Sequence, residues 1–367
     1  MFGMRWMRLR ALITIVGAAL AIGLIAPVGA AGAGPSNFVV ASGLHSPRGL
    51  DFGPGGILYV AESGDATHGG AVLQIRNSAS RNPITRTIVD GLPTIGDEGE
   101  FLGIDGISVL GRGTHQTIYG VFGLAPQITG SADFGRVVKI SRTGNVSPIT
   151  NIGQFDFDWG KAHSFLWQEF VNGDANPYGI LALPGHLYVV DAGENTLNEV
   201  HPDGSIDILA YLPNEALRDA IPTCVRQGPD GALYIGTLAF VDSAFLGPSA
   251  KVYRIDPSEA NLAEPWNSPM TVWASGLWPI NGCDFGPDGT FYASQLFTDP
   301  AWLFSGGLAP AHGDVVAIPW GSPSTHRSLA DGSLGTTGGV AVGPNGTVFV
   351  SNNTVGPGGQ ILRLSNR

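Results

Sequence analysis

Short apolar runs recur along the chain in pairs, each pair joined by a tight polar turn. The clearest pair spans residues 281–294, where Gly-Pro-Asp-Gly separates an apolar run from a second run that opens with two aromatic residues. Proline at the second position of such a turn fixes φ, and glycine supplies the left-handed corner of a hairpin. The pattern occurs six times, starting at residues 49, 106, 179, 224, 282 and 339.

Each copy of the hairpin opens a longer unit of four strand-like runs. In the first unit the runs are Gly49–Phe52, Leu58–Glu62, Ala71–Ile75 and Thr85–Val89. In the fifth they are Gly282–Phe285, Phe291–Gln295, Asp314–Ile318 and His326–Leu329. Four short antiparallel strands repeated six times are typical of a β-propeller, whereas a β-sandwich has no reason to repeat one hairpin six times. The sequence therefore predicts an all-β, six-bladed propeller of four-stranded antiparallel blades.

The two ends of the chain indicate how the ring closes. The sixth unit ends with its third strand, Gln360–Leu364, while Phe38–Ala41 resembles an outer strand such as Thr271–Ala274. We expect residues 38–42 to complete blade six, because this closure leaves no bare sheet edge between the first and last blades. Residues 38–367 then form one domain.

Two series of residues recur once per blade and are expected to pack blade against blade. One follows each starting position: Leu50, Ile107, Ile180, Val225, Cys283 and Val340. The other series is an aromatic residue at or near the start of each second strand: Tyr59, Tyr119, Tyr188, Tyr234, Tyr292 and Phe349. The aromatic residues are therefore interpreted as core, not as a cofactor site.

Loop lengths distinguish the two faces of the predicted ring. Turns between first and second strands are short, whereas connections between second and third strands, and between blades, vary and emerge together on the opposite face. Function tends to reside on such elaborated loops. The longest insertion, Gln154–Asp174, contains apolar residues at helical spacing over Trp159–Phe170, and we expect this helix to cover the tunnel mouth.

The first 30 residues have the composition of a secretory signal peptide. Arg5, Arg8 and Arg10 precede an apolar run that is short for a membrane span, and small residues allow cleavage after Ala30 or Ala33. Residues 31–37 form a linker. The protein is expected to be secreted, with no membrane attachment after cleavage.

Charge excludes some partners. Charged residues make up 13% of the chain, and removal of residues 1–30 changes the formal net charge from −11 to −14. Such an acidic protein is a poor candidate for nucleic acid or anionic lipid.

Polar residues begin the innermost strands and should ring the tunnel mouth as a ligand site. They are Arg48, Asp105, Tyr178, Thr223 and Asn281, with Asn176 close by. Ca²⁺ or Mg²⁺ is conceivable there, but hard cations usually need more than one carboxylate, and this ring offers Asp105 opposed by Arg48. We predict no metal and no other cofactor.

Residues on the same strands predict one contact between blades four and five and leave a second one open. Arg226 and Asp284 are expected to form an ion pair. Cys224 and Cys283 either converge on the shared interface, where export permits a disulfide, or diverge completely. The eight histidines show no pair at metal-binding spacing, and no nucleophile elbow, phosphate loop or Cys-x-x-Cys is present.

Several segments together resemble the ScyD/ScyE family of exported β-propellers, which is similar to six-bladed NHL-type propellers. They are residues 38–50, Asp-Ala-Asn-Pro-Tyr-Gly-Ile at 174–180, and residues 187–197, 221–236 and 338–352. The family has no established reaction to transfer. This chain departs from it at Thr237 and Gln295, where the family usually has Glu, so an activity that needs those acids is in doubt.

These observations favour a secreted, monomeric binding or accessory module whose partner, a small molecule or a protein, binds at the tunnel mouth. The alternative is a metal-dependent hydrolase or isomerase of a small metabolite at the same place, as in gluconolactonase-like propellers. The fold alone does not decide between them.

Overall fold

The computed structural model describes residues 37–97, 100–111, 116–167, 173–305 and 309–365. The predicted signal peptide and residues 31–36 of the linker lie outside these ranges. Within them, no helix is both long and apolar enough to cross a membrane.

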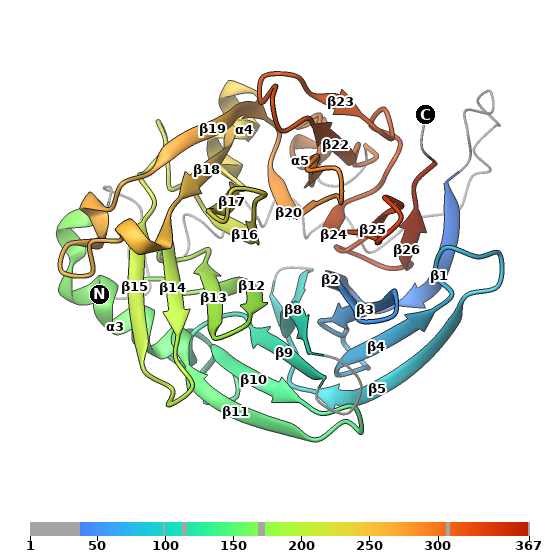
Figure 1. The fold of residues 1–367 in the computed structure, drawn as a ribbon, viewed down its shortest axis with the longest axis horizontal. Coiled ribbons are helices and arrows are strands. Elements are labelled where there is room, and N and C mark those ends of the chain that lie inside the picture. Colours follow the sequence, from blue (N-terminus) through green and yellow to red (C-terminus); the bar gives the residue numbers. More distant parts are fainter. Residues whose placement is uncertain (1–36, 98–99, 112–115, 168–172, 306–308, 366–367) are drawn as a thin grey trace.

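Six four-stranded antiparallel sheets surround a central axis (Figure 1). Blade one contains β2 (Pro47–Gly53), β3 (Ile57–Glu62), β4 (Gly70–Arg76) and β5 (Ile84–Leu92). Blade two contains β8 (Ile104–Leu110), β9 (Thr117–Phe122), β10 (Arg136–Ile140) and β11 (Val146–Asn151). Blade three contains β12 (Pro177–Leu183), β13 (His186–Asp191), β14 (Thr196–Val200) and β15 (Ile206–Tyr211).

The second half of the ring repeats this arrangement. Blade four contains β16 (Pro222–Gln227), β17 (Leu233–Thr237), β18 (Ala250–Ile255) and β19 (Thr271–Leu277). Blade five contains β20 (Ile280–Phe285), β21 (Phe291–Gln295), β22 (Asp314–Ile318) and β23 (Arg327–Ser328). Blade six contains β24 (Thr337–Val342), β25 (Val348–Asn352), β26 (Gly359–Arg363) and β1 (Phe38–Leu44). The predicted six-bladed propeller is confirmed.

The remaining elements lie in connections between the blade strands. They are the hairpin β6 (Ile95–Asp97) and β7 (Glu100–Leu102), the helices α2 (Pro126–Thr129), α3 (Ile152–Ala162), α4 (Phe240–Leu246) and α5 (Ala301–Phe304), and the 3₁₀ turns η2 (Ser164–Leu166), η3 (Pro257–Glu259) and η4 (Pro265–Asn267). All but η3 and η4 occupy connections that emerge on the predicted loop-rich face.

The N-terminal strand closes the ring, as predicted. β1 pairs antiparallel with β26, with Phe38 opposite Arg363 and Leu44 opposite Gly359. The Arg363 guanidinium also lies 4.5 Å from the centre of the Phe38 ring. Blade six is therefore built from both ends of the described chain, and its third strand is paired on both sides.

One apolar cluster fills each interface between neighbouring blades. Every cluster joins the aromatic residue of one blade to the inner-strand apolar residue of the next: Tyr59 with Ile107, Tyr119 with Ile180, Tyr188 with Val225, Tyr234 with Cys283, Tyr292 with Val340, and Phe349 with Leu50. The interpretation of both series as interblade core is confirmed.

Close approach of the inner strands explains why glycine begins most of the repeats. A Cβ on Gly106 would lie 2.2 Å from the carbonyl oxygen of Tyr178, and one on Gly282 would lie 2.7 Å from the Cα of Gly339. Side chains at these positions would therefore push neighbouring blades apart at the axis. The tunnel is narrow because these backbones nearly touch.

The predicted helix over Trp159–Phe170 is confirmed over Trp159–Ala162, but its start and its expected place over the tunnel mouth are wrong. Helix α3 instead starts at Ile152, because the side chain of Asn151 accepts a hydrogen bond from the Gln154 amide and caps the first turn. Residues 168–170 lie outside the described residues. Figure 1 shows α3 beside β15 at the outer edge of the ring, where Trp159 lies 6.2 Å from Tyr211 between ring centres. The described part of the insertion does not cover the tunnel mouth.

A disulfide joins Cys224 on β16 to Cys283 on β20, with 5.8 Å between the Cα atoms. Of the two geometries left open by the sequence, the structure shows the one in which both side chains converge on the interface between blades four and five. Both residues are buried in that interface.

Candidate functional site at the tunnel mouth

The inner strands bring most of the predicted ring together around the axis. Asp105, Tyr178, Thr223 and Asn281 line a cavity of about 30 Å³, and Arg226 lines it further along the tunnel. This volume is enough for roughly one or two water molecules. The predicted residues are thus gathered at one place, but the space among them is small.

Arg48 is 3% exposed and is held by hydrogen bonds from two directions. Its Nη2 donates to Glu100 Oε1 at 2.5 Å and to the carbonyl oxygen of Phe101 at 2.9 Å. Its Nη1 donates to the Tyr178 hydroxyl at 3.5 Å, and its Nε lies 3.8 Å from Asp105 Oδ1. Glu100 comes from the hairpin β6–β7, so this hairpin holds the arginine at the tunnel mouth.

Asp105 is fully buried beside this arginine. Its Oδ1 accepts a hydrogen bond from Ser63 Oγ at 2.6 Å, whereas its Oδ2 has no partner among the described residues. Burial raises the pKa of Asp105 to about 6, although Arg48 and the Ser63 hydrogen bond oppose this. A Cβ on Gly123 would lie 2.2 Å from Oδ2 and 2.8 Å from Asn176 Oδ1, so glycine leaves room there for both oxygens.

The other polar residues of the ring bond to the main chain. Thr223 Oγ1 donates to the carbonyl oxygen of Ile280 at 2.6 Å, and Asn281 Nδ2 donates to that of Thr337 at 2.8 Å. Asn176 Oδ1 accepts from the Leu124 amide at 2.9 Å. These side chains tie neighbouring segments together and satisfy backbone groups that the strand ends leave unpaired.

A hard cation does not fit this arrangement. Ca²⁺ and Mg²⁺ need several oxygen ligands, usually including more than one carboxylate. Asp105 faces a buried guanidinium, and the second nearby carboxylate, Glu100, is bonded to that same guanidinium. A cation at the mouth would be repelled by Arg48.

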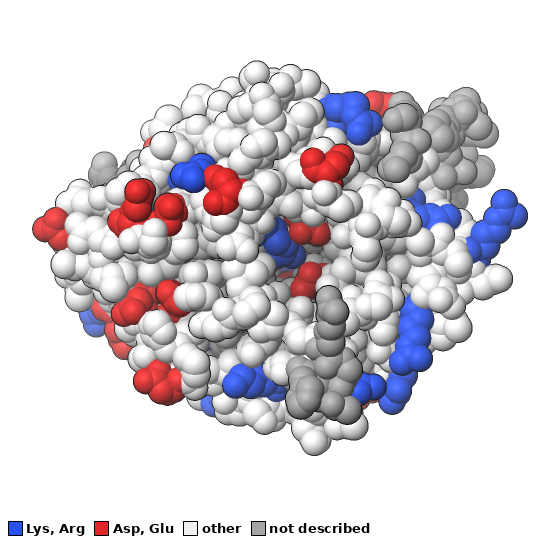
Figure 2. Space-filling view, viewed as in Figure 1, with Lys and Arg blue, Asp and Glu red and all other residues white. Residues whose placement is uncertain are grey.

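Arg226 spans the tunnel one layer further along the axis. Its Nε lies 3.3 Å from Asp284 Oδ1, which confirms the predicted ion pair, and its Nη2 donates to the carbonyl oxygen of Leu50 at 3.3 Å. Burial raises the pKa of Asp284, and it raises the pKa of Asp51 to about 6 against the opposing charge of Arg226. Figure 2 shows basic and acidic side chains gathered in the central hollow of the face in view.

Comparisons with known proteins support the fold and no more. No protein-family model and no curated protein matches this chain. Among solved structures, a dehydrogenase-like protein of Thermus thermophilus is 17% identical with a TM-score of 0.53, covering 90% of this chain and 99% of that one. A luciferin-regenerating enzyme is 10% identical with a TM-score of 0.52, covering 90% and 96%. Virginiamycin B lyase of Staphylococcus aureus, in an inactive form with quinupristin, is 12% identical with a TM-score of 0.50, covering 90% and 99%.

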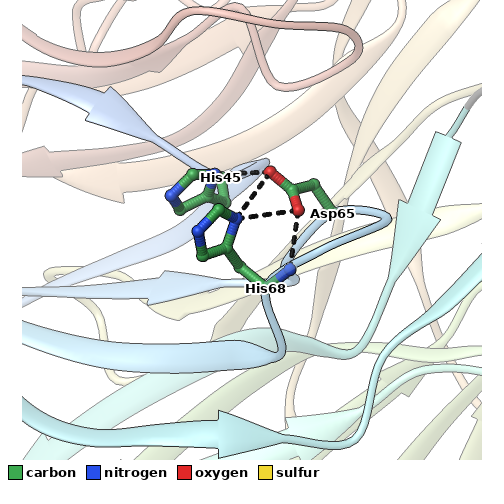
Figure 3. Close-up of side chains that lie close together, drawn as sticks. All are labelled: His45, Asp65 and His68. Atoms are coloured by element: carbon green, nitrogen blue, oxygen red, sulfur yellow. Dashed lines mark hydrogen bonds and ion pairs between the residues drawn. The ribbon is translucent and has the colours of Figure 1, made fainter.

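A group of side chains that sequence reasoning missed lies on the loops of blade one. His45 Nδ1 is 2.6 Å from Asp65 Oδ2, and His68 Nδ1 is 3.0 Å from Asp65 Oδ1 (Figure 3). The two imidazole rings stack with their centres 4.0 Å apart. Histidine spacing along the chain gave no signal, because the residues are 23 positions apart. The topology of the blade could have indicated the group. His45 precedes the inner strand of blade one, whereas Asp65 and His68 lie in the connection between its second and third strands, and these two connections emerge on the same face.

A second missed group consists of buried acids between α3 and blade three. Burial and the neighbouring Asp191 raise the pKa of Asp156 well above its usual range, and burial raises the pKa of Glu194 to about 9. Glu194 Oε1 accepts a hydrogen bond from Trp167 Nε1 at 2.9 Å. A Cβ on Gly160 of α3 would lie 2.0 Å from the carboxyl carbon of Glu194, so the helix rests directly on this acid.

Proposed function

We propose that this protein is an exported binding or accessory module of the ScyD/ScyE kind, and that its partner is a protein that docks on the loop-rich face. The observation that carries the proposal is an apolar patch on the connections of blades four and five. Its members are Phe245 and Leu246 on α4 and Phe304 on α5, which are 52%, 59% and 54% exposed.

The patch rests on a rigid base. The Phe245 and Phe304 rings lie 5.5 Å apart between centres, and beneath the two helices a buried cluster includes Leu296, Phe297 and Leu303. Leu217, which is also exposed, lies in the connection between blades three and four. Its amide donates a hydrogen bond to Asp242 Oδ1 of α4 at 3.0 Å. Exposed aromatic and aliphatic side chains held on fixed elements are typical of protein-binding surfaces.

The tunnel supports a protein partner over a small metabolite. Sites for small molecules usually enclose about 300–1,000 Å³, whereas the cavity at the tunnel mouth has about 30 Å³. Its polar groups are engaged mainly with one another and with the backbone. The cavity therefore has little room for a substrate, and few of its polar atoms are free to bind one, as a hydrolase or isomerase at the tunnel mouth would require.

The test compares capture of exported proteins by immobilised wild type, by a Phe245→Asp/Phe304→Asp double variant, and by a Phe165→Asp control. Phe165 is also highly exposed but lies on η2, beside α3. We expect a partner that wild type and control retain and that the double variant loses at least tenfold, measured by quantitative mass spectrometry. Equal capture by all three proteins would contradict the proposed patch.

Elemental analysis addresses the enzyme alternative. Asp105 Oδ2 is the one feature that favours it, because this oxygen is buried and lacks a partner among the described residues. A stoichiometric Ca²⁺ or Mg²⁺ ion that survives desalting in wild type and is lost in Asp105→Ala would replace the binding proposal by a metal-dependent enzyme. We expect no such ion.

A further inference from the structure

The two imidazoles of His45 and His68 face a single carboxylate from two different loops. All three residues place a metal-binding atom within 4.8 Å of the others, and they form the one such group of three found among the described His, Cys, Asp and Glu residues. Figure 3 shows both rings on the same side of the Asp65 carboxylate. His68 is more than half exposed and His45 and Asp65 are partly exposed, so an ion can enter directly from solvent.

Main-chain hydrogen bonds hold the two loops in this position. The Ser63 amide donates to the Ser46 carbonyl at 3.0 Å, and the Gly64 amide donates to the His45 carbonyl at 3.1 Å. The His45 amide in turn donates to the Glu62 carboxylate at 2.7 Å. The backbone of both loops is thus fixed independently of the three side chains, which makes the group preorganised.

Main-chain amides bind Asp65 Oδ1, whereas Oδ2 faces the two imidazoles, 2.6 Å from His45 Nδ1 and 3.1 Å from His68 Nδ1. Oδ1 accepts hydrogen bonds from the Thr67 amide and from the His68 amide, both at 2.7 Å. These bonds orient the carboxylate so that Oδ2 lies against the His45 ring. One carboxylate oxygen and two imidazole nitrogens remain as candidate ligands.

We propose that His45, Asp65 and His68 form a binding site for a zinc-type divalent transition metal. Two imidazoles and one carboxylate are a donor set for Zn²⁺, Co²⁺ or Ni²⁺, and three protein ligands leave a position for water. Ca²⁺ and Mg²⁺ prefer oxygen donors and are not expected to bind. Neighbouring ligands of tetrahedral zinc lie about 3.3 Å apart. Asp65 Oδ2 lies 2.6 Å from His45 Nδ1 and 3.1 Å from His68 Nδ1, so these two pairs have to separate by less than about 1 Å.

The position of the site gives the metal a structural consequence. His45 directly follows β1, the strand that completes blade six, whereas Asp65 and His68 belong to blade one. A bound ion therefore connects the closing strand to the first blade. This inference is independent of the proposed protein partner, because the apolar patch lies on blades four and five.

The experiment uses untagged protein stripped with EDTA and titrated calorimetrically with ZnCl₂. We expect one Zn²⁺ per chain in wild type, at least a hundredfold weaker binding in His68→Gln, and unchanged binding in a His312→Gln control, where the exposed histidine lies on a blade-five loop. CaCl₂ should give no binding.

Two further measurements use the same proteins. Co²⁺ should give visible absorption bands with wild type and none with Asp65→Asn. Free Zn²⁺ at roughly a hundredfold excess over Kd should raise the melting temperature of wild type by several degrees but not that of His45→Gln. Absence of 1:1 binding to wild type, or equal binding by His68→Gln, would overturn the proposal and leave only imidazole–carboxylate contacts.

Discussion

The guanidinium of Arg226, on blade four, donates a hydrogen bond across the tunnel to the carbonyl oxygen of Leu50, on blade one. Blades one and four are opposite each other in a six-bladed ring. The same side chain lies against Asp284 of blade five and donates to the carbonyl oxygen of Ile180 of blade three at 3.4 Å, so one residue connects four blades at the axis.

Replacement of Arg226 by Gln is expected to destabilise the protein strongly at pH 7. The change leaves Asp284 and Asp51 buried without their cation, and loss of one partner of a buried ion pair typically costs about 3–5 kcal/mol. The loss should shrink at pH 5, because burial raises the pKa of Asp51 to about 6 and also raises that of Asp284, and without the charge of Arg226 both carboxyls bind protons more readily. Chemical unfolding at both pH values measures the difference.

Two companion variants test the cause. An Arg226→Gln/Asp284→Asn double variant should recover part of the lost stability, and Arg86→Gln, which changes an exposed arginine on β5, should have little effect. A loss in Arg226→Gln that does not depend on pH would indicate that packing, not charge, is responsible.

Glu194 should make stability fall as the pH rises. The unfolded chain releases this proton near 4.5, whereas the folded protein retains it up to about 9. The stabilisation is therefore complete below pH 4.5 and is lost progressively between these values, by at most about 1.4 kcal/mol per pH unit. Asp156 and Asp191 act in the same direction, because burial also raises their pKa values.

A Glu194→Gln variant should flatten the dependence of the melting temperature on pH between 5 and 9, because glutamine stays neutral with nearly the same shape. Exposed Glu259→Gln serves as the control and should keep the slope of wild type. An unchanged slope in Glu194→Gln would show that this carboxyl is ionised in the folded protein.

Deletion of residues 38–41 should lower the melting temperature far more than removal of residues 31–35. The first change removes most of β1 and leaves β26 with an unpaired edge, whereas the second leaves every described strand intact. Calorimetry of the two truncated proteins provides the comparison. Equal melting temperatures would contradict closure of the ring by this strand.

The disulfide is expected to form under oxidising conditions and to contribute to the stability of the protein. Cys224 and Cys283 are separated by 59 positions, and a cross-link over such a loop contributes about 4 kcal/mol in the chain-entropy estimate. Non-reducing peptide mapping should recover the linked peptides, and a Cys224→Ser/Cys283→Ser variant should unfold at lower denaturant concentration. Two free thiols under denaturing alkylation would refute the bridge.

The sixfold repeat allowed the fold to be predicted from the sequence. Six recurrences of one hairpin determined the number of blades, and the aromatic residue of each copy, such as Tyr234, identified the interblade core. The Arg226–Asp284 pair followed from strand phase alone. These predictions succeeded because a period-two strand pattern, once its register is known, determines where each side chain points.

The irregular connections were less predictable. Helix α3 starts seven residues before its predicted start because the cap at Asn151 outweighed the apolar spacing further along. Glu100 was missed because the path of the hairpin β6–β7 does not follow from the repeat. His45 and His68 were missed because their proximity arises from two loops of one blade, which no spacing along the chain reveals.

Sharing blade six between both chain ends has a consequence for biogenesis. The first described strand, β1, has no partner until Gly359–Arg363 have been made. Five blades can form while Phe38–Leu44 is still an unpaired, partly apolar strand. Unpaired strands are prone to pairing with strands of other molecules. The protein is therefore most prone to intermolecular pairing before residues 359–363 have been synthesised, and a chain that stops short of residue 359 cannot complete blade six.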